Sequence, residues 1–296
     1  MTANGNMMGA AMRLLAGAAL LLSLAGCQAQ KVLNAMTPTS TYEGSTNLVY
    51  DAERGLKLDV YTPDGAIASP VVVFFYGGRW QQGDKSLYRF VGQALSSRGF
   101  VPVLPDLRKF PQAAFPEFVE DGAQAVRWVR EQVRHYGGDP SRVFVMGHSS
   151  GAHVAALLAM DRRYLNAVGS PPPLGFIGLA GPYDFLPLRD PDLQQIFAPA
   201  STPEQTQPIR YVTREAPPML LIHGEDDETV DIANSQRLAA AARDAGAAVE
   251  LVEYPKMDHA RVIGALAAPL RLLGNVLDEI EQFVVRHADR SGGKRP

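Results

Sequence analysis

Short apolar runs rich in β-branched and aromatic side chains recur along the chain, and longer segments with helical periodicity separate them. Most of these runs are continuously apolar, which is typical of strands buried on both faces of a parallel sheet. We expect strands at residues 71–75, 100–104, 142–146, 175–179, 219–222 and 249–252. We expect helices at residues 84–97, 115–136, 150–160, 232–245 and 269–287.

The order of these elements predicts the fold class. Two further strands, at 47–50 and 56–61, precede the alternating part and are joined by a turn that contains Gly55. Strands that alternate with helices predict an α/β fold, here a doubly wound, mostly parallel sheet with helices on both faces. Functional sites in such sheets lie outside the carboxyl ends of the strands, so candidate chemistry should gather there.

The predicted organisation is a single domain at 46–287 with one long interruption. Residues 181–218 join two strands and are rich in proline and polar side chains. A connection of this length indicates a lid or a small helical insert. Residues 288–296 have the polar composition of a disordered tail.

The chain begins with a stretch that is typical of a secretory signal. Arg13 precedes an apolar segment at 14–26, which is too short to span a bilayer but fits the hydrophobic region of a signal peptide. The letters LAGC that end at Cys27 resemble the lipobox of bacterial lipoproteins. The alternative is an ordinary signal peptide with a cysteine nearby by chance.

The lipobox resemblance has consequences for the mature protein. It implies that residues 1–26 are removed and that the thiol of Cys27 carries a lipid. Two acyl chains would anchor the protein stably to a membrane. Gln28, in place of Asp, implies the outer membrane of a bacterial cell envelope. Residues 27–45, which are polar and rich in Pro, Ser and Thr, are then expected to form a tether.

The composition limits which classes of partner and cofactor we expect. The chain has 296 residues, 46% of them hydrophobic and 20% charged, and a formal net charge of −3. No cluster of Lys and Arg interrupts this balance, which argues against a nucleic-acid partner. Because Cys27 is the one cysteine, neither a disulfide framework nor a cysteine-based metal site is available. No phosphate loop or metal-ligand motif is present in the sequence, and we expect no cofactor.

A candidate nucleophile lies where a predicted strand meets a predicted helix. The strand at 142–146 runs into the letters GHSSG at 147–151, and the helix follows. This context resembles the nucleophile elbow of the α/β-hydrolases, which implies Ser149 as the nucleophile. The two flanking glycines lack a Cβ, so strand and helix can approach closely around it. The alternative is a tight turn in which Ser149 only caps the helix.

A serine hydroxyl is a weak nucleophile unless a base accepts its proton. In α/β-hydrolases an acid and then a histidine follow the nucleophile along the chain. The letters HGEDDETV at 223–230 resemble the acid loop H-G-x-x-D-x-x-V, which assigns the acid to Asp227, with Asp226 as the alternative. Of six histidines, His259 alone lies between the last predicted strand and the last predicted helix. We expect it to be the general base, oriented by Asp227.

A pair of glycines, Gly77 and Gly78, follows an apolar strand where the resemblance places the loop that binds the oxyanion. We expect the amides of these two residues and of Ser150, at a helix N-terminus, to bind it. The family often has His-Gly-Gly-Gly here, whereas this chain has Tyr76 before the pair and Arg79 after it. Tyr76 either braces the loop or offers its hydroxyl to the oxyanion. Arg79 either faces the cleft, where it would favour an anionic substrate, or caps a loop.

The resemblance extends over residues 71–259. The letters DLR at 106–108 stand where the family has Asp-Tyr-Arg, and we interpret Asp106 and Arg108 as a structural pair near the oxyanion loop. The chain is similar to a group of α/β-hydrolase esterases that includes hormone-sensitive-lipase-like carboxylesterases, isoprenylcysteine methylesterases and kynurenine formamidases.

This similarity implies a serine hydrolase that cleaves small-molecule carboxylic esters with small or medium acyl groups, through an acyl-enzyme. One alternative is an arylformamidase or peptidase that uses the same three side chains. Another is a non-catalytic envelope lipoprotein built on a hydrolase fold.

Overall fold

An eight-stranded sheet forms the centre of the protein in the computed structural model, which describes residues 31–290. The strands are β1 (Tyr42–Asp51), β2 (Leu56–Pro63), β3 (Ser69–Phe75), β4 (Val101–Pro105), β5 (Gly138–His148), β6 (Phe176–Leu179), β7 (Met219–Gly224) and β8 (Val249–Tyr254). Their order across the sheet is β1-β2-β4-β3-β5-β6-β7-β8. The pairs that involve β2 are antiparallel and all others are parallel. The predicted mostly parallel α/β sheet is confirmed.

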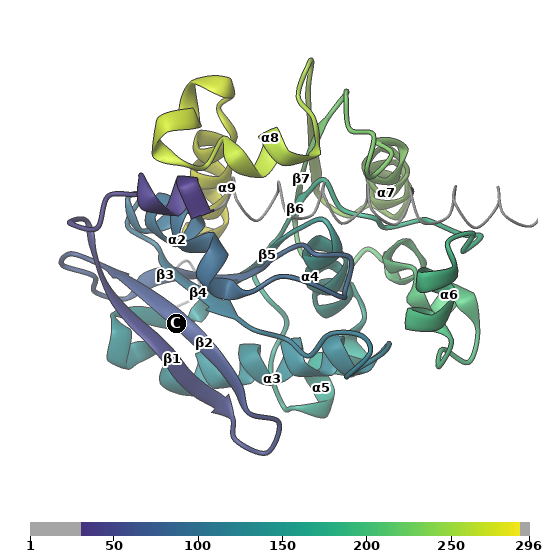
Figure 1. Ribbon diagram of the computed structural model, residues 1–296, viewed down its shortest axis with the longest axis horizontal. Coiled ribbons are helices and arrows are strands. Elements are labelled where there is room, and N and C mark those ends of the chain that lie inside the picture. Colours follow the sequence, from purple (N-terminus) through teal and green to yellow (C-terminus); the bar gives the residue numbers. More distant parts are fainter. Residues whose placement is uncertain (1–30, 291–296) are drawn as a thin grey trace, which may run out of the picture.

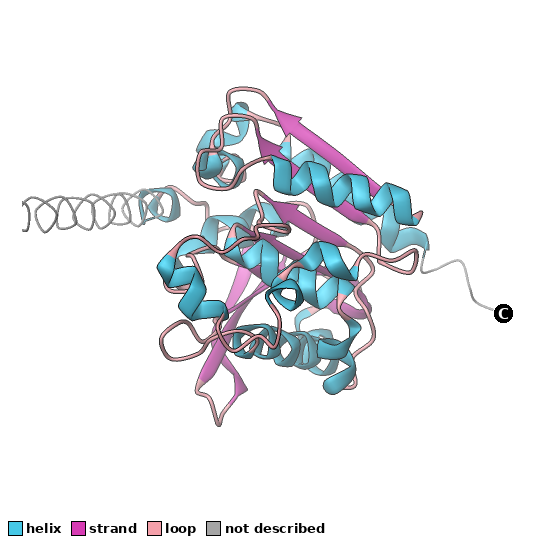
Figure 2. Ribbon diagram, turned by 90° about the vertical axis from the view of Figure 1, so that its right-hand side faces the viewer, coloured by secondary structure: helices cyan, strands magenta, loops and turns pink. Residues whose placement is uncertain are grey.

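Helices cover both faces of this sheet (Figure 1), and Figure 2 shows helices and strands from a second direction. One face is covered by α3 (Glu117–Gln132), α4 (Ser150–Met160), α5 (Arg162–Ala167), α6 (Pro191–Phe197) and α7 (Ala233–Ala245). The other is covered by α2 (Arg89–Ser96), α8 (His259–Gly264) and α9 (Val276–Arg290). Short 3₁₀ helices are η1 (Lys85–Tyr88), η2 (Val133–Tyr136), η3 (Pro203–Thr206), η4 (Pro208–Tyr211) and η5 (Ala268–Leu273).

The continuous apolar runs are explained by this arrangement. Alternate side chains of β3 point to opposite faces of the sheet, with Val71 and Val73 in one core cluster and Val72 and Phe74 in the other. All four are fully buried. Full burial of each such side chain contributes about 1.5–3 kcal/mol to folding. The sheet is therefore held firmly enough to fix the loops at its carboxyl edge.

The segment expected to be a tether is partly structured. Residues 31–35 form a helical turn, here called the N-terminal turn, and β1 begins at Tyr42, ahead of the predicted domain start at residue 46. Leu33 in that turn packs against the core cluster that contains α2 and α9. The predicted signal peptide and Cys27 lie outside the described residues. Within residues 31–290, no helix has the length and apolar character needed to cross a membrane.

Two further segments differ from their expected form or extent. Residues 181–218 contain α6, η3 and η4, so the small helical insert, one of the two expected forms, is what the chain adopts. The expectation that the tail starts at residue 288 is wrong, because α9 continues to Arg290. Ala288 is buried on the inner face of that helix, which extends the packed surface beyond the predicted end.

Candidate active site

Ser149 occupies a strained turn between β5 and α4. Its backbone angles are φ 56° and ψ −128°, an unusual conformation for a residue with a side chain. A Cβ on Gly147 would lie 2.2 Å from the carbonyl oxygen of Gly151, and one on Gly151 would lie 2.1 Å from that of Phe75. Both glycines are therefore required by the close approach of strand, helix and neighbouring strand. The sharp bend places the Ser149 side chain at the carboxyl edge of the sheet.

The carboxylate of Asp227 joins the loop after β7 to His259. Its Oδ2 lies 2.7 Å from Nδ1 of His259, and its Oδ1 accepts hydrogen bonds from the amides of Thr229 and Val230, each at 2.9 Å. Asp226 is exposed, and its amide donates to the carbonyl oxygen of Met257 at 3.2 Å. The structure thus brings Asp227, and not the alternative Asp226, to the imidazole.

A second histidine, which the sequence analysis did not assign, also binds this carboxylate. Nε2 of the fully buried His223 lies 3.1 Å from Oδ2 of Asp227, and its Nδ1 lies 2.7 Å from Oγ of Ser235. Burial alone would raise the pKa of Asp227, but hydrogen bonds from His223 and His259 outweigh it and hold the pKa well below its usual range. The carboxylate stays charged. The signal that could have found His223 is its place in the acid-loop motif, four residues before Asp227.

His259 is fixed by its neighbour at the end of β5. Nε2 of His148 donates to the carbonyl oxygen of His259 at 3.1 Å, and the two ring centroids are 4.6 Å apart. Burial, with a smaller effect of the nearby His259, lowers the pKa of His148 to about 3. His148 is therefore neutral near pH 7 and adds no positive charge beside the candidate base.

The tautomer of His259 follows from its partner. Because a carboxylate can only accept, Nδ1 carries a hydrogen, and in the neutral form of the ring the lone pair is therefore on Nε2. Within residues 31–290, no hydrogen bond joins that nitrogen to Oγ of Ser149. Such contacts are often long in unliganded enzymes and shorten when substrate binds. Because His148 and Ser149 are adjacent in the chain, the contact with the His148 ring places His259 near the turn that carries Ser149.

The two glycines after β3 lie against Ser149. A Cβ on Gly77 would lie 2.9 Å from Cβ of Ser149. Gly78 has φ +150°, and a Cβ there would lie 2.1 Å from the carbonyl oxygen of Gln82. Among the described residues, no acceptor receives a hydrogen bond from the amides of Gly77, Gly78 or Ser150. Free amides beside a nucleophile, one of them at the N-terminus of α4, suit a developing negative oxygen.

Tyr76 braces the candidate oxyanion loop, which carries Gly77 and Gly78. Its hydroxyl donates to Oδ1 of Asp106 at 2.8 Å and accepts from Nζ of Lys109 at 3.2 Å. The same Oδ1 accepts the amide of Lys85 at 3.0 Å. Because the hydroxyl has a single hydrogen and donates it to Asp106, it is not available to an oxyanion. The bracing interpretation of Tyr76 is therefore the one that the structure supports.

Two arginines around this loop bind carboxylates. The expectation that Asp106 pairs with Arg108 is wrong, because Arg108 donates from two nitrogens to the buried carboxylate of Asp121, with a shortest distance of 2.8 Å. Arg108 therefore does not bind Asp106, whose carboxylate accepts hydrogen bonds from Tyr76 and Lys85 instead. Arg79 forms a 2.8 Å ion pair with Asp190, the residue that caps α6, and both side chains are largely exposed. Arg79 thus links the loop to the insert.

An aromatic cluster joins the oxyanion loop to the insert more tightly. Nε1 of Trp80 donates to Nδ1 of His153 at 3.3 Å, and the Trp80 ring packs edge-on against Phe197 of α6, with centroids 5.0 Å apart. Nε2 of His153 in turn donates to the carbonyl oxygen of Thr206, at 2.7 Å. Burial lowers the pKa of His153 to about 4, so it stays neutral in these bonds.

A small cavity lies beside Ser150 and Gly151, and a wider hollow lies within the insert. A cavity of about 20 Å³ is lined in part by Trp80, Ser150 and Gly151, which is room for about one water or methyl-sized group. A hollow of about 620 Å³ is lined by residues of the insert, including Leu186 and Phe197. Since Phe197 also contacts Trp80, the insert shapes both spaces.

Comparison with known families decides where the chain belongs. Residues 58–169 match the BD-FAE model, and residues 117–290, more than half of the chain, match the model of the prolyl oligopeptidase family. The chain belongs to the prolyl oligopeptidase family. The expected resemblance to α/β-hydrolases is confirmed, and the two matched ranges together contain every candidate catalytic and oxyanion residue.

The individual relatives that the chain resembles are named as esterases. The chain is 29% identical over 268 residues to a probable isoprenylcysteine alpha-carbonyl methylesterase of Oryza sativa subsp. japonica, with 82% of this chain and 64% of that protein covered. It is 32% identical over 214 residues to esterase LipQ of Mycobacterium tuberculosis, with 65% and 50% covered. The chain therefore spans between half and two thirds of these relatives.

A solved structure supports the fold. The apo form of Thermogutta terrifontis esterase 2 is similar with a TM-score of 0.70 at 24% identity, and the similarity covers 84% of this chain and 96% of that one. At this level of identity the similarity bears on the fold alone, which agrees with the mostly parallel sheet described above.

Proposed function

We propose that the protein is a serine hydrolase that cleaves carboxylic esters with small or medium acyl groups. The observation that carries this proposal is the 2.7 Å contact between Asp227 and His259 at the edge of the sheet where Ser149 stands in its strained turn. A charged carboxylate, an imidazole bound to it through Nδ1 and a serine on a sharp bend are the parts needed for acyl transfer. Relatives named as esterases support the same chemistry.

The first half of the reaction forms an acyl-enzyme. Oγ of Ser149 attacks the ester carbonyl carbon while Nε2 of His259 accepts the hydroxyl proton. The carbonyl oxygen becomes negative and is bound by the amides of Gly77, Gly78 and Ser150. As the intermediate collapses, His259 gives the proton to the leaving alcohol and the ester bond breaks.

The second half returns the enzyme to its starting state. A water molecule attacks the acyl carbon, His259 accepts a proton from it, and Oγ of Ser149 leaves and regains a proton from the imidazolium. Asp227 keeps its charge throughout, because its depressed pKa reflects hydrogen bonds from His223 and His259 that persist in the folded protein. Its role is to hold the imidazole and stabilise the imidazolium.

Hydrolysis of p-nitrophenyl acetate and butyrate tests the proposal, with Ser149→Ala and Ser150→Ala as a matched pair. We expect Ser149→Ala to abolish turnover of both esters. Ser150→Ala should retain activity, because it keeps the backbone amide and removes only the neighbouring hydroxyl. Full activity in Ser149→Ala would overturn the assignment. Wild type that is folded but inert to esters and to serine-directed probes would instead favour a non-catalytic lipoprotein.

The bond type is tested separately. The same three side chains could cleave N-formyl amides or aminoacyl amides, so both classes are assayed beside the simple esters by kcat/KM. We expect the esters to have the higher values. Higher values for an aryl formamide or an aminoacyl amide would move the assignment to an arylformamidase or a peptidase while leaving Ser149 as the nucleophile.

We further propose that the mature protein is anchored to the bacterial cell envelope, in the outer membrane, through a lipid on Cys27. The LAGC motif and the preceding apolar segment support this proposal. Intact-mass analysis of the protein extracted from membranes should give a chain that starts at Cys27 and carries acyl groups. The Cys27→Ala variant should lose the lipid. A mature chain that begins elsewhere and has no acyl mass would contradict it.

A further inference from the structure

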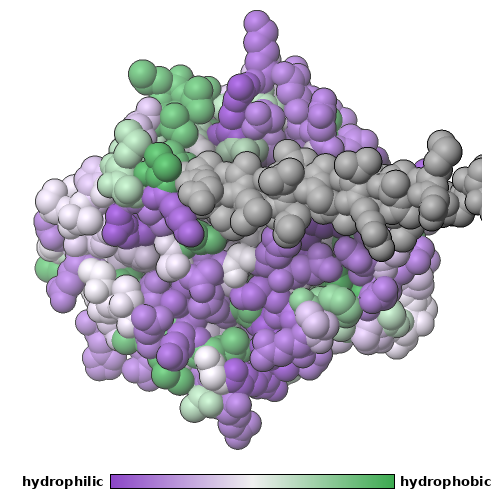
Figure 3. Space-filling model, in the orientation of Figure 1, coloured by the Kyte–Doolittle hydropathy of each residue, from purple (hydrophilic) through white to green (hydrophobic). Residues whose placement is uncertain are grey.

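A group of exposed apolar side chains surrounds the point where the described chain begins. Val32 and Met36 in and beside the N-terminal turn are 56% and 57% exposed, and Leu272 and Leu273 at the end of η5 are 100% and 46% exposed. We call these four residues the N-terminal apolar patch. Figure 3 shows apolar side chains gathered at the corresponding upper left of the molecule. Scattered exposed apolar residues are ordinary in proteins, but a cluster marks an interaction surface.

The helical geometry of the N-terminal turn gives the patch a defined outward face. The amide of Met36 donates to the carbonyl oxygen of Val32 at 3.1 Å, so these two side chains lie one turn apart on the same side. Leu33, the next residue along the turn, packs against the protein core. The turn is thus attached through Leu33 and leaves Val32 and Met36 exposed.

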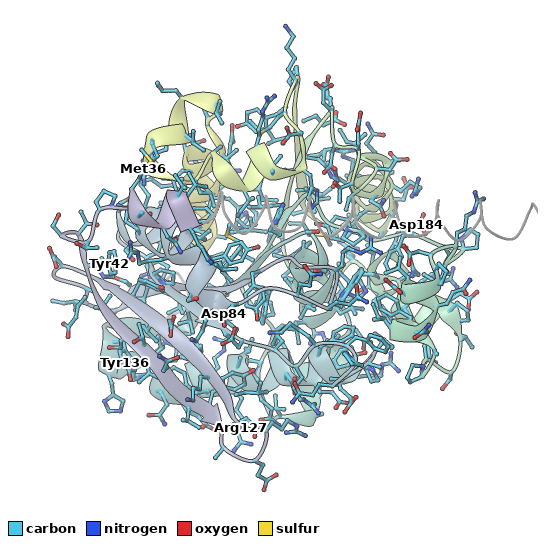
Figure 4. The ribbon with its side chains drawn as sticks, viewed as in Figure 1. Met36, Tyr42, Asp84, Arg127, Tyr136 and Asp184 are labelled. Atoms are coloured by element: carbon cyan, nitrogen blue, oxygen red, sulfur yellow. The ribbon has the colours of Figure 1, made fainter. Side chains whose placement is uncertain are left out.

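The two halves of the patch are held together by α2. Oδ1 of Asn34 accepts the amide of Phe90 at 3.1 Å, and Nη2 of Arg271 donates to Oε1 of Gln93 at 3.1 Å. Phe90 and Gln93 are three residues apart on that helix, so the turn and η5 are neighbours. Figure 1 shows the purple turn next to the yellow segment that follows α8, and Figure 4 places Met36 there.

The chain that precedes the patch indicates what covers it. Lys31 is the first described residue, and Cys27 lies four residues before it. Four fully extended residues span at most about 14 Å. A lipid on Cys27 would therefore bring the N-terminal turn to within that distance of the bilayer. A patch of apolar side chains at this point gains by burial in the boundary between headgroups and acyl chains, at a depth of about 5–10 Å.

We propose that the N-terminal apolar patch is a second contact with the lipid surface, which orients the protein on the membrane. The inference rests on the proposed anchor at Cys27. It adds that the folded domain touches the bilayer through Val32, Met36, Leu272 and Leu273 instead of moving freely on a long tether. Because η5 follows α8 in the chain, the contact would also set how the side of the molecule that carries His259 is oriented relative to the membrane.

Tryptophan fluorescence of the full lipidated protein in phosphatidylcholine vesicles tests this orientation. Leu272→Trp places a reporter in the patch. Ile67→Trp is the matched control, because Ile67 is 87% exposed and lies in the loop between β2 and β3, beside Gly137. Emission of the two native tryptophans is subtracted with the wild-type spectrum. Retained ester hydrolysis and Tm show that each variant is folded.

We expect the added emission of Leu272→Trp to shift to shorter wavelength in vesicles and to be quenched by lipids brominated in the upper acyl chain. The added emission of Ile67→Trp should do neither. Absence of quenching for Leu272→Trp in protein that carries its lipid and sediments with vesicles would overturn the patch proposal and leave the anchor intact. Protein that lacks acyl mass and does not sediment with vesicles would overturn the anchor and the patch together, whatever its esterase activity.

Discussion

The edge that carries Ser149, Asp227 and His259 is built differently from the loop that carries Gly77 and Gly78. At the first, the bend at Ser149 and the turn at Asp227 are set locally: glycines on either side of Ser149 permit a strained bend, and Asp227 accepts amides two and three residues ahead of it. Only His259 is held there by distant contacts, with Asp227 32 positions away and with His148 111 positions away. The second is held by contacts distant in sequence. Tyr76 binds a residue 30 positions away, Trp80 one 73 away and Arg79 one 111 away.

The difference shows how one active site divides its tasks. The groups proposed to react are set by short sequence patterns, so the loss of one should remove chemistry without unfolding the protein. The groups proposed to bind the oxyanion are positioned by tertiary contacts with the insert and with the loop after β4. Changes there should act through position and stability, with graded effects on rate.

The largest expected effect is that of Asp227→Asn. The uncharged amide cannot stabilise an imidazolium, and it can donate to Nδ1 and favour the wrong tautomer, so we expect kcat for p-nitrophenyl acetate to fall about 10⁴-fold. Asp226→Asn is the matched control, because that side chain is exposed. Its kcat should stay at the wild-type level. If Asp226→Asn were the damaging change, the assignment of the acid would be wrong.

A smaller loss is expected at the oxyanion loop. Gly78→Ala would place a Cβ 2.1 Å from the carbonyl oxygen of Gln82 in a backbone conformation that disfavours side chains. The loop must shift, and loss of one oxyanion donor costs about 10²–10³ in kcat. Gly264→Ala, with its nearest contact at 3.6 Å, is the control and should retain activity. Equal kcat values for the two variants would remove Gly78 from the oxyanion site.

A pH-dependent effect is expected where the oxyanion loop meets the insert. Burial lowers the pKa of His153 to about 4, whereas a histidine in an unfolded chain titrates near 6.5. The unfolded state therefore binds more protons between these values, so stability is complete above about pH 6.5 and falls as the pH drops towards 4.

Urea unfolding of wild type and His153→Gln, between pH 7.5 and 4.5, measures this effect. The variant should be less stable at neutral pH because a buried bond to Trp80 or Thr206 is altered. Its free energy of unfolding should also fall less steeply with acid, since one titrating group is gone. Parallel pH dependences for the two proteins would show that His153 is not held neutral by the fold.

The smallest effect is expected for the ion pair between Arg79 and Asp190. Both side chains are largely exposed, so a double-mutant cycle with Arg79→Ala and Asp190→Ala should give a coupling of about 0.2–1 kcal/mol in stability. Because Asp190 already neutralises Arg79, the KM ratio of anionic to neutral esters should be unchanged in Arg79→Ala. A selective rise in KM for anionic esters would show that Arg79 faces the substrate.

Much of the reacting edge could be predicted from the sequence because its determinants are local. The sequence alone shows the Gly-x-Ser-x-Gly spacing, the ends of the strands and the chain order of Ser149, Asp227 and His259. The choice between Asp227 and Asp226 needed coordinates, since only the turn geometry directs one carboxylate inward. His223 went unassigned because its contact with Asp227 depends on the same turn.

The oxyanion loop was less predictable for a physical reason. Whether the Tyr76 hydroxyl points to an oxyanion or to Asp106 depends on where β4 ends relative to β3. The partner of Arg108 is set by the placement of α3, which brings Asp121 beneath it. The start of β1 at Tyr42 was missed because its exposed, polar residues carry little hydrophobic signal and are defined by pairing with β2.

The most direct test of the account is to locate the covalent adduct that a fluorophosphonate forms with the active protein. Peptide mass spectrometry should find the adduct on Ser149 in wild type and in Ser150→Ala, and none on the corresponding peptide of Ser149→Ala. An adduct on Ser150 or on another residue would contradict the claim that Ser149 is the nucleophile. The same claim would fail if the probe inhibited ester hydrolysis by the wild type while Ser149 stayed unmodified.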